Sequence, residues 1–207
     1  MIQVFEKRNQ PGSFRVDNGE PFGSPSNDTP PPLALWLIGM DIDMIWNKPR
    51  TPQMNGVVER LQQTSSCWAE IDKCSSYAQL QDQLDGQALI QRSLFPVARL
   101  KNQTRSQAFA GIEKSDRVWC PEAFCAQRVY AFLARKVFTR KVASARHVTH
   151  FNKQIYGLSA FKGQYVQLCL NPNTLEWQIF HQHQLIKTSC AAQALAKDRL
   201  LNLSIFQ

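Results

Sequence analysis

The order in which short strands and helices follow one another is the feature that most limits how this chain folds. Phe14–Val16 alternates apolar and polar side chains and stops at an Asp-Asn-Gly turn signal that starts at Asp17, so it predicts a strand. The apolar segment Leu33–Met40 follows prolines and predicts a buried helix, and Ile42–Trp46 predicts a second strand. A helix is expected from Gln53, with helical spacing of Val57, Leu61, Thr64, Trp68 and Ile71. This alternation is typical of an α/β domain.

The C-terminal half has a β-type pattern. Apolar side chains alternate at 166, 168 and 170 and again at 175, 177 and 179, on either side of the turn Asn171–Thr174, which predicts a β-hairpin with one apolar face. We interpret Val129–Phe138 and Gln154–Leu158 as further β-rich segments, so a small barrel or sandwich is expected. Ala191–Asn202 predicts a terminal helix. Four segments are therefore expected: an α/β segment at 1–75, a helical and basic linker at 76–125, a small β-domain at 126–190, and a terminal helix at 191–207.

The positive charge of the chain is concentrated in its middle. The net charge is +8, but residues 99–165 contain 13 Lys and Arg against three acids, whereas the rest contains 11 basic and 13 acidic residues. Such a block favours binding to a polyanion, because Lys and Arg that neutralise phosphates release condensed counterions. The alternative is a solvated basic surface. The densest cluster, in which we expect contacts to the DNA backbone, consists of Arg135, Lys136, Arg140, Lys141 and Arg146.

The sequence favours a cytoplasmic protein. No apolar run approaches the roughly 18 residues of a membrane-spanning helix, and the N-terminus lacks the apolar stretch of a signal peptide. The six cysteines have no zinc-finger spacing. No membrane partner is therefore expected.

Two acidic residues are candidates for metal chemistry. Asp17 ends the first predicted strand, and Glu59 lies on the predicted helix, about 200° around the helix from Val57. Carboxylates brought together from a strand end and a helix suit a hard divalent cation, and paired cations activate a nucleophile for phosphodiester chemistry. The simpler interpretation is an ordinary Asp-Asn-Gly turn and a solvated helical Glu.

Four motifs give the region 14–75 a specific resemblance. They are Val16-Asp-Asn-Gly-x-Pro-Phe22, Leu35-Trp-Leu-Ile-Gly39, Ile45-Trp-Asn-x-Pro-Arg50 and Pro52-Gln-x-Asn-Gly-x-Val-Glu-Arg60. In order and spacing they resemble the second half of the catalytic core of DDE-type insertion-sequence transposases with a retroviral-integrase-like core. The resemblance extends more loosely to the C-terminal β-domain, where these transposases carry a small DNA-binding barrel.

The resemblance implies a fold and a site. In that family two Asp and one Glu bind two Mg²⁺ (or Mn²⁺) ions on a ribonuclease-H-like fold and carry out DNA strand cleavage and transfer. Asp17 would be the second Asp and Glu59 the Glu, both as catalytic residues and metal ligands. Lys48, Arg50 and Arg60 flank this site and are expected to hold DNA phosphates, with solvated surface charge as the alternative. The fold class expected is α/β, with a partial integrase core at 1–75 followed by a small all-β, barrel-like domain.

The departures from the family pattern set limits on the function. Only 16 residues precede Asp17 and none is Asp, so the first catalytic Asp is missing and the two-ion site is incomplete. Two strands are expected to leave the apolar faces of Leu33–Met40 and Val57–Ile71 uncovered. Since a two-stranded sheet is marginal in water, residues 1–75 are expected to fold poorly alone. We therefore expect the C-terminal part of a transposase that is inactive alone.

This interpretation implies nucleic-acid and protein partners. The expected DNA partners are transposon ends and target DNA, and the protein would be associated with the nucleoid when it is bound to DNA. The expected protein partner is a second copy of the chain or a full-length transposase. The alternative from a different class is a non-catalytic DNA-binding product or one that inhibits the transposase. A third is a decayed reading frame, whose product would aggregate or be digested easily.

Overall fold

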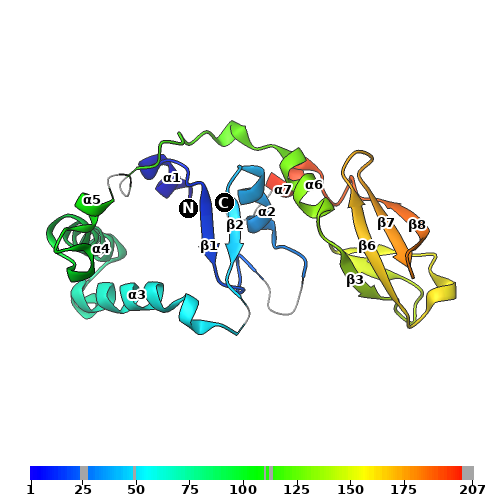
Figure 1. Cartoon of the computed structure of the whole chain (residues 1–207), viewed down its shortest axis with the longest axis horizontal. Helices are drawn as coiled ribbons and strands as arrows, with labels where there is room; N and C mark the ends of the chain where they lie inside the picture. The colour runs from blue at the N-terminus through cyan, green and yellow to red at the C-terminus, as the bar shows by residue number, and fades with distance from the viewer. Residues whose placement is uncertain (24–27, 49, 110, 112–113, 202–207) are drawn as a thin grey trace. The chain divides into compact units, whose positions relative to one another are not determined.

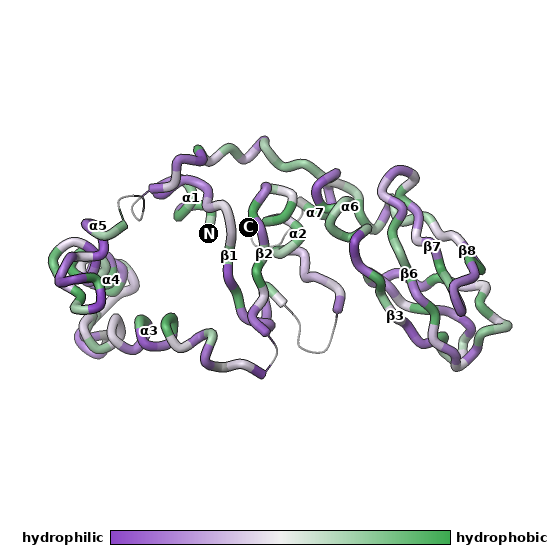
Figure 2. The backbone as a smooth tube through the Cα atoms, in the orientation of Figure 1, coloured by the Kyte–Doolittle hydropathy of each residue, from purple (hydrophilic) through white to green (hydrophobic). Residues whose placement is uncertain are grey.

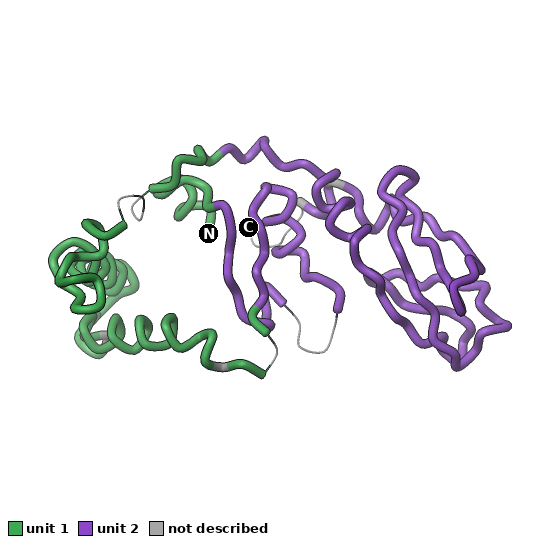
Figure 3. The backbone as a smooth tube through the Cα atoms, viewed as in Figure 1, with its two compact units in different colours: residues 1–11, 47–119 green, residues 12–46, 120–207 purple. Residues whose placement is uncertain are grey.

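The chain forms two compact units, each built from two separate stretches of sequence. A computed structural model describes residues 1–23, 28–48, 50–109, 111 and 114–201, without the side chains of Pro52, Ile71, Lys197 and Leu201. Unit 1 comprises residues 1–11 and 47–119, and unit 2 comprises residues 12–46 and 120–207 (Figure 3). Pro49, residues 24–27 of the Pro-rich loop and residues 202–207 of the predicted terminal helix lie outside the described residues. The four segments predicted from sequence stay predictions.

Unit 2 begins with a strand, a helix and a second strand that pairs in parallel with the first. Strand β1 (Ser13–Val16) pairs with β2 (Asp43–Trp46), with Val16 opposite Trp46 (Figure 1). Helix α2 (Pro32–Gly39) connects them, since parallel strands need a crossover connection. The expected strand–helix–strand order is confirmed.

Helix α2 is the most buried helix of the chain as described. Five of its apolar side chains are buried, in agreement with its hydrophobic colour in Figure 2, and it packs against α6 (Ala126–Ala134) and α7 (Lys197–Leu201). The expectation that Leu33–Met40 would be uncovered is therefore wrong, because helices from the C-terminal half cover it. The β-rich interpretation of Val129–Phe138 is also wrong over α6, whose buried Val129, Tyr130 and Leu133 lie on one helical face.

The C-terminal part of unit 2 is an antiparallel sheet in the order β3-β6-β7-β8. Its strands are β3 (Phe138–Lys141), β6 (Tyr165–Asn171), β7 (Glu176–His181) and β8 (Gln184–Cys190). The predicted hairpin is confirmed: Asn171 pairs with Glu176, and the Asn171 carboxamide oxygen accepts from the backbone of Asn173 at 3.0 Å. The apolar face buries Leu168, Trp177 and Ile179.

The barrel-like part of the fold prediction is not met in the part of the chain that the structure describes. The four-stranded sheet stays open, with β3 and β8 at its edges, and a separate two-stranded sheet pairs β4 (Val148–His150) with β5 (Lys153–Ile155). One-turn helices occur at Pro121–Ala123 and Ser159–Phe161. The fold class is mixed α/β, in agreement with the coarser prediction.

Unit 1 is helical. Its longer helices are α1 (Ile2–Arg8), α3 (Gly56–Trp68) and α4 (Tyr77–Leu89), which continues as a π-helix over Ile90–Leu94. The shorter ones are α5 (Arg105–Ala108) and the one-turn helices Pro52–Met54, Ile71–Lys73 and Ala98–Leu100. Residues 8–11 hydrogen-bond to residues 115–117, with the Gln10 amide donating to the Arg117 carbonyl at 2.8 Å. No described helix is long and apolar enough to cross a membrane.

Buried apolar side chains are very unequally shared between the two units. Of the 27 buried hydrophobic residues described, only Phe5 and Ala69 belong to unit 1. Helix α3 has no buried residue, and Val57 is 70% exposed. The expectation that the apolar face beginning at Val57 would be uncovered is thus confirmed for the side chains that the structure describes. The hydrophobic core of this protein lies in unit 2.

Candidate functional site

Asp17 directly follows β1 and is exposed at the carboxyl end of the parallel strand pair. Its Oδ1 accepts a hydrogen bond from the Gly19 amide at 3.1 Å, which turns the chain away from the strand. The turn closes tightly, because a Cβ on Gly23 would lie 2.8 Å from the Asn18 carbonyl carbon. Open α/β sheets commonly place functional residues at this edge.

The end of the neighbouring strand β2 carries Trp46, and the cation of Lys136 lies close to this ring. The Trp46 indole Nε1 donates to the Phe22 carbonyl at 2.9 Å, which ties the end of β2 to the turn after Asp17. The Lys136 Nζ lies 5.8 Å from the Trp46 ring centroid and 4.9 Å from that of Phe132. A hollow of about 140 Å³ is lined by Asn18, Gly23, Asp28, Thr29, Pro30, Pro31, Trp46 and Lys136. The structure therefore brings Lys136, one of the predicted DNA-binding residues, to the same hollow as the residue after Asp17.

Glu59 lies in the first turn of α3 and is exposed. Asn55 directly precedes the helix; its side-chain oxygen accepts from the Asn47 carboxamide, and its carbonyl accepts from the Glu59 amide at 3.0 Å. Asp17 belongs to unit 2 and Glu59 to unit 1, so the pairing of the two carboxylates stays a prediction. Among the described residues, no group of three or more His, Cys, Asp or Glu side chains is arranged to hold a metal ion.

The predicted DNA-binding residues divide between the units. Lys48, Arg50 and Arg60 are exposed in unit 1, and Arg135, Lys141 and Arg146 are exposed in unit 2. Lys141 lies opposite Tyr165 on the neighbouring strand, with its Nζ 6.0 Å from the ring centroid. These exposed cations are free of acidic partners among the ion pairs of the described residues and are accessible to a polyanion.

Arg140 has a different environment from its neighbour Lys141. Successive residues of a strand face opposite sides, so Arg140 points to the side where Phe138 is buried. Its Nη2 donates to Asp28 Oδ1 and to Thr29 Oγ1, both at 2.8 Å, and lies 3.3 Å from His150 Nδ1. The Arg140 side chain is 19% exposed and is engaged in joining the 28–29 segment to the sheet. The alternation of β3 places Arg140 and Lys141 on opposite faces, but the sequence alone did not identify the buried face.

His150 completes this cluster and was not selected from the sequence. It is buried, and its ring centroid lies 4.6 Å from Phe138, 4.8 Å from Phe151 and 4.4 Å from Trp177. Its Nε2 is buried without a hydrogen-bond partner in the described part, and the ring meets Phe151 and Trp177 edge-on. Burial, and secondarily the nearby Arg140 guanidinium, lower the His150 pKa to about 3, against a smaller opposing effect of Asp28. The imidazole is therefore neutral at pH 7.

Comparisons with known proteins add no identification. No protein-family model matches the chain, and no curated protein matches its sequence. The motifs and the geometry of each unit are therefore the basis for assigning a function.

Proposed function

We propose that this chain is a DNA-binding part of a DDE-type transposase with an integrase-like, ribonuclease-H-like core. In this proposal β1, α2 and β2 belong to the core, Asp17 and Glu59 are its second Asp and its Glu, and the basic residues of unit 2 hold DNA. The observation that carries the proposal is the position of Asp17, exposed at the carboxyl end of a strand whose parallel neighbour is reached through α2.

The carboxylates fit a hard cation in chemistry but not in number. Oxygen donors from Asp17 and Glu59 suit Mg²⁺ or Mn²⁺, which would activate the attacking oxygen and stabilise the leaving one when bound. The family's site needs three acids, of which Asp17 and Glu59 would be two. We therefore propose that the chain does not cleave or join DNA by itself.

DNA binding is supported by the charge and by the packing together. Arg135, Lys141 and Arg146 are exposed on unit 2, which also contains nearly all of the buried apolar side chains described. Cations held on a well-packed unit lose less conformational freedom on binding than cations on a loosely packed one. The same observation favours the second candidate, a non-catalytic product that binds DNA or inhibits a complete transposase.

A joining assay, with duplex binding followed in parallel, tests the inactivity and the DNA binding that both candidates share. The full chain, its Asp17→Asn and Glu59→Gln variants, and a labelled duplex are incubated with Mg²⁺ or Mn²⁺, and joined and cleaved strands are separated on a denaturing gel. We expect duplex binding by all three proteins and no metal-dependent product from any of them. A product that both substitutions abolish would overturn the proposed inactivity and identify a complete enzyme. Failure of all three proteins to bind duplex would contradict both candidates.

A further inference from the structure

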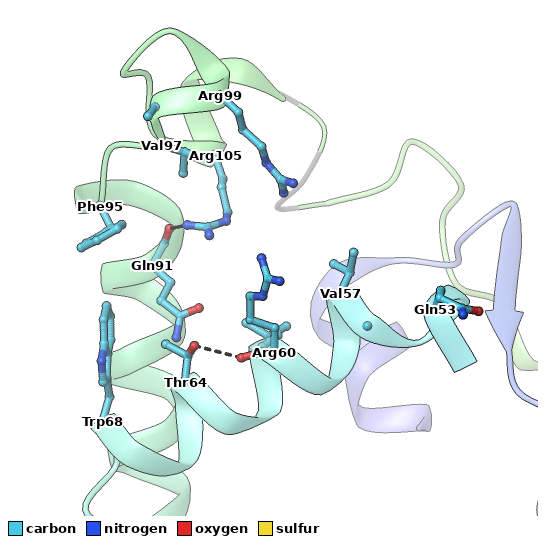
Figure 4. A pocket seen from close by; sticks show the side chains of 13 residues that line it. Gln53, Val57, Arg60, Thr64, Trp68, Gln91, Phe95, Val97, Arg99 and Arg105 are labelled. Carbon is cyan, nitrogen blue, oxygen red and sulfur yellow. Dashed lines mark hydrogen bonds between the residues drawn. The ribbon is translucent and has the colours of Figure 1, made fainter. Parts of the chain in front are cut away.

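Unit 1 has a groove that its own core does not fill. It lies between α3 and the segment 91–105, with a volume of about 850 Å³ (Figure 4). The α3 side of the groove carries Val57, Leu61, Thr64 and Trp68, whose spacing of four, three and four residues places them on one helical face. The exposed fraction is 70% for Val57 and 50% for Leu61.

Apolar side chains also line the opposite wall of the groove. Phe95 meets Trp68 edge-on at a centroid distance of 5.6 Å, and Val97 and Ala98 continue the wall. A groove with an apolar stripe at helical spacing on one side has the form that an amphipathic helix enters with its own apolar face. Filling it would give unit 1 the buried apolar contacts that its described side chains lack.

Three arginines give the groove a positive charge. Arg60 comes from α3, Arg99 from the one-turn helix Ala98–Leu100 and Arg105 from α5, and Figure 4 shows their guanidinium groups pointing toward the space between the walls. The Arg105 Nη1 donates to the Gln91 carbonyl at 2.6 Å, which fixes that side chain. No acidic residue is among the described residues that line the groove. Three cations that point into the same space without a neighbouring carboxylate create a positive potential, which a bound anionic group would neutralise.

We propose that this groove docks an amphipathic helix of a partner protein whose apolar face is flanked by Asp or Glu. The apolar side chains of the partner would contact Val57, Leu61 and Phe95, and its carboxylates would pair with Arg60, Arg99 and Arg105. Arg–carboxylate pairs have the geometry for two parallel hydrogen bonds, which would fix the register of the bound helix. A nucleic-acid phosphate would neutralise the arginines but would leave the exposed apolar stripe of α3 without a partner.

The docking face is separate from the proposed metal ligand. Glu59 is not a lining residue and lies about 200° around α3 from both Val57 and Leu61. Docking therefore does not require Glu59 to be released from any role in metal binding. The inference holds whether or not the chain belongs to a transposase.

The test uses the full chain and a synthetic helical peptide as the probe. A fluorescein-labelled peptide of about 20 residues carries Leu on one face and Glu on its flanks, and binding is followed by fluorescence anisotropy. Controls are the same peptide with Lys in place of Glu, and one with Ser in place of Leu. We expect saturable binding of the acidic peptide, at least about tenfold tighter than either control peptide.

Matched variants locate the binding. Leu61→Asp and Arg99→Glu are expected to weaken binding of the acidic peptide at least about tenfold. Gln62→Asp and Lys101→Glu introduce the same charges at exposed positions that do not line the groove, and they should bind within about twofold of the unmodified chain. Hydrogen exchange of the α3 amides should slow when the peptide is added, which would locate the bound peptide at the groove.

Three results would overturn the proposal. One is no saturable binding of the acidic peptide, and another is equal weakening by the control substitutions. The third is preferential binding of a labelled oligonucleotide that loses affinity in Leu61→Asp and Arg99→Glu, which would make the groove a nucleic-acid site.

Discussion

Arg140 donates a 2.8 Å hydrogen bond to the carboxylate of Asp28, 112 residues earlier in the chain. The same Nη2 donates to Thr29 at 2.8 Å, so a single guanidinium joins the segment before α2 to β3 of the antiparallel sheet. A residue that belongs to the basic cluster by sequence thus has a structural role. Its neighbour Lys141 faces the opposite side of the strand and is exposed.

This difference predicts that Arg140 contributes to stability, whereas its neighbour Lys141 contributes to DNA binding. Arg140→Ala should lower the free energy of unfolding by about 1–3 kcal/mol, because it removes the hydrogen bonds that a charged group donates to Asp28 and Thr29. Lys141→Ala should change it by less than about 0.5 kcal/mol. Urea unfolding followed by tryptophan fluorescence measures both. Equal stability of the two variants would contradict the joining role of Arg140.

His150 predicts an acid dependence of stability. Its pKa is about 3 in the folded chain and about 6.5 when unfolded, so between these values the unfolded chain binds more protons. Stability should therefore be fully present above pH 6.5 and decrease as the pH falls toward 3, by up to about 1.4 kcal/mol per pH unit. Unfolding curves from pH 7 to 4 measure this slope. His150→Phe should have a shallower slope, and an unchanged slope would mean that another group titrates.

Gly39 should tolerate no side chain. A Cβ there would lie 2.2 Å from the Phe124 ring, and the Gly39 carbonyl accepts from the Cys125 amide at 3.0 Å, so Phe124 cannot move away freely. Gly39→Ala should destabilise the chain by about 1–3 kcal/mol through overpacking. Gly86→Ala in α4 is the control, because nothing lies within 4 Å of its Cβ. There the change should add about 0.5–1 kcal/mol through helix propensity. Thermal unfolding compares the two, and similar melting temperatures would contradict this packing.

The unequal distribution of buried apolar side chains between the two units predicts that their amides are unequally protected from hydrogen exchange. Amides of β6 and β7 should exchange at the slowest rates of the chain, because their strands bury Leu168, Trp177 and Ile179. Amides of α3 should exchange faster, since that helix has no buried side chain. Exchange followed by mass spectrometry resolves both segments. Equal protection of α3 and β7 would show that unit 1 has a core of its own.

The sequence predicted elements whose signals are local. The Asn171–Thr174 turn and its flanking alternation specified the β6–β7 hairpin, and the continuous apolar run after the prolines specified α2. Helix α6 was missed because Val129, Tyr130 and Phe132 favour strands by propensity, although Val129 and Leu133 keep helical spacing. Strand propensity was a weak guide there, since burial against α2 decides the conformation.

Contacts between residues that are far apart in the sequence could not be predicted from it. Nothing local links residues 8–11 to 115–117 or Arg140 to Asp28, so the two discontinuous units and the engaged state of Arg140 were not predicted. For the candidate site, the turn signal placed Asp17 correctly at a strand end. The charge count identified a basic block but could not separate exposed cations from engaged ones, because that depends on which face of β3 is buried.

Duplex binding as a function of salt tests whether the exposed cations of unit 2 hold DNA. Fluorescence anisotropy with a labelled duplex is measured for the unmodified chain, for Lys141→Glu with Arg146→Glu, and for Lys73→Glu, an exposed cation of unit 1 outside the cluster. We expect binding that weakens steeply with salt, and in the double variant a log–log slope whose magnitude is smaller by about 0.9 for each lost phosphate contact. Lys73→Glu should keep the unmodified slope. A chain that does not bind duplex, or a double variant that binds with unchanged affinity and slope, would contradict DNA binding by these cations.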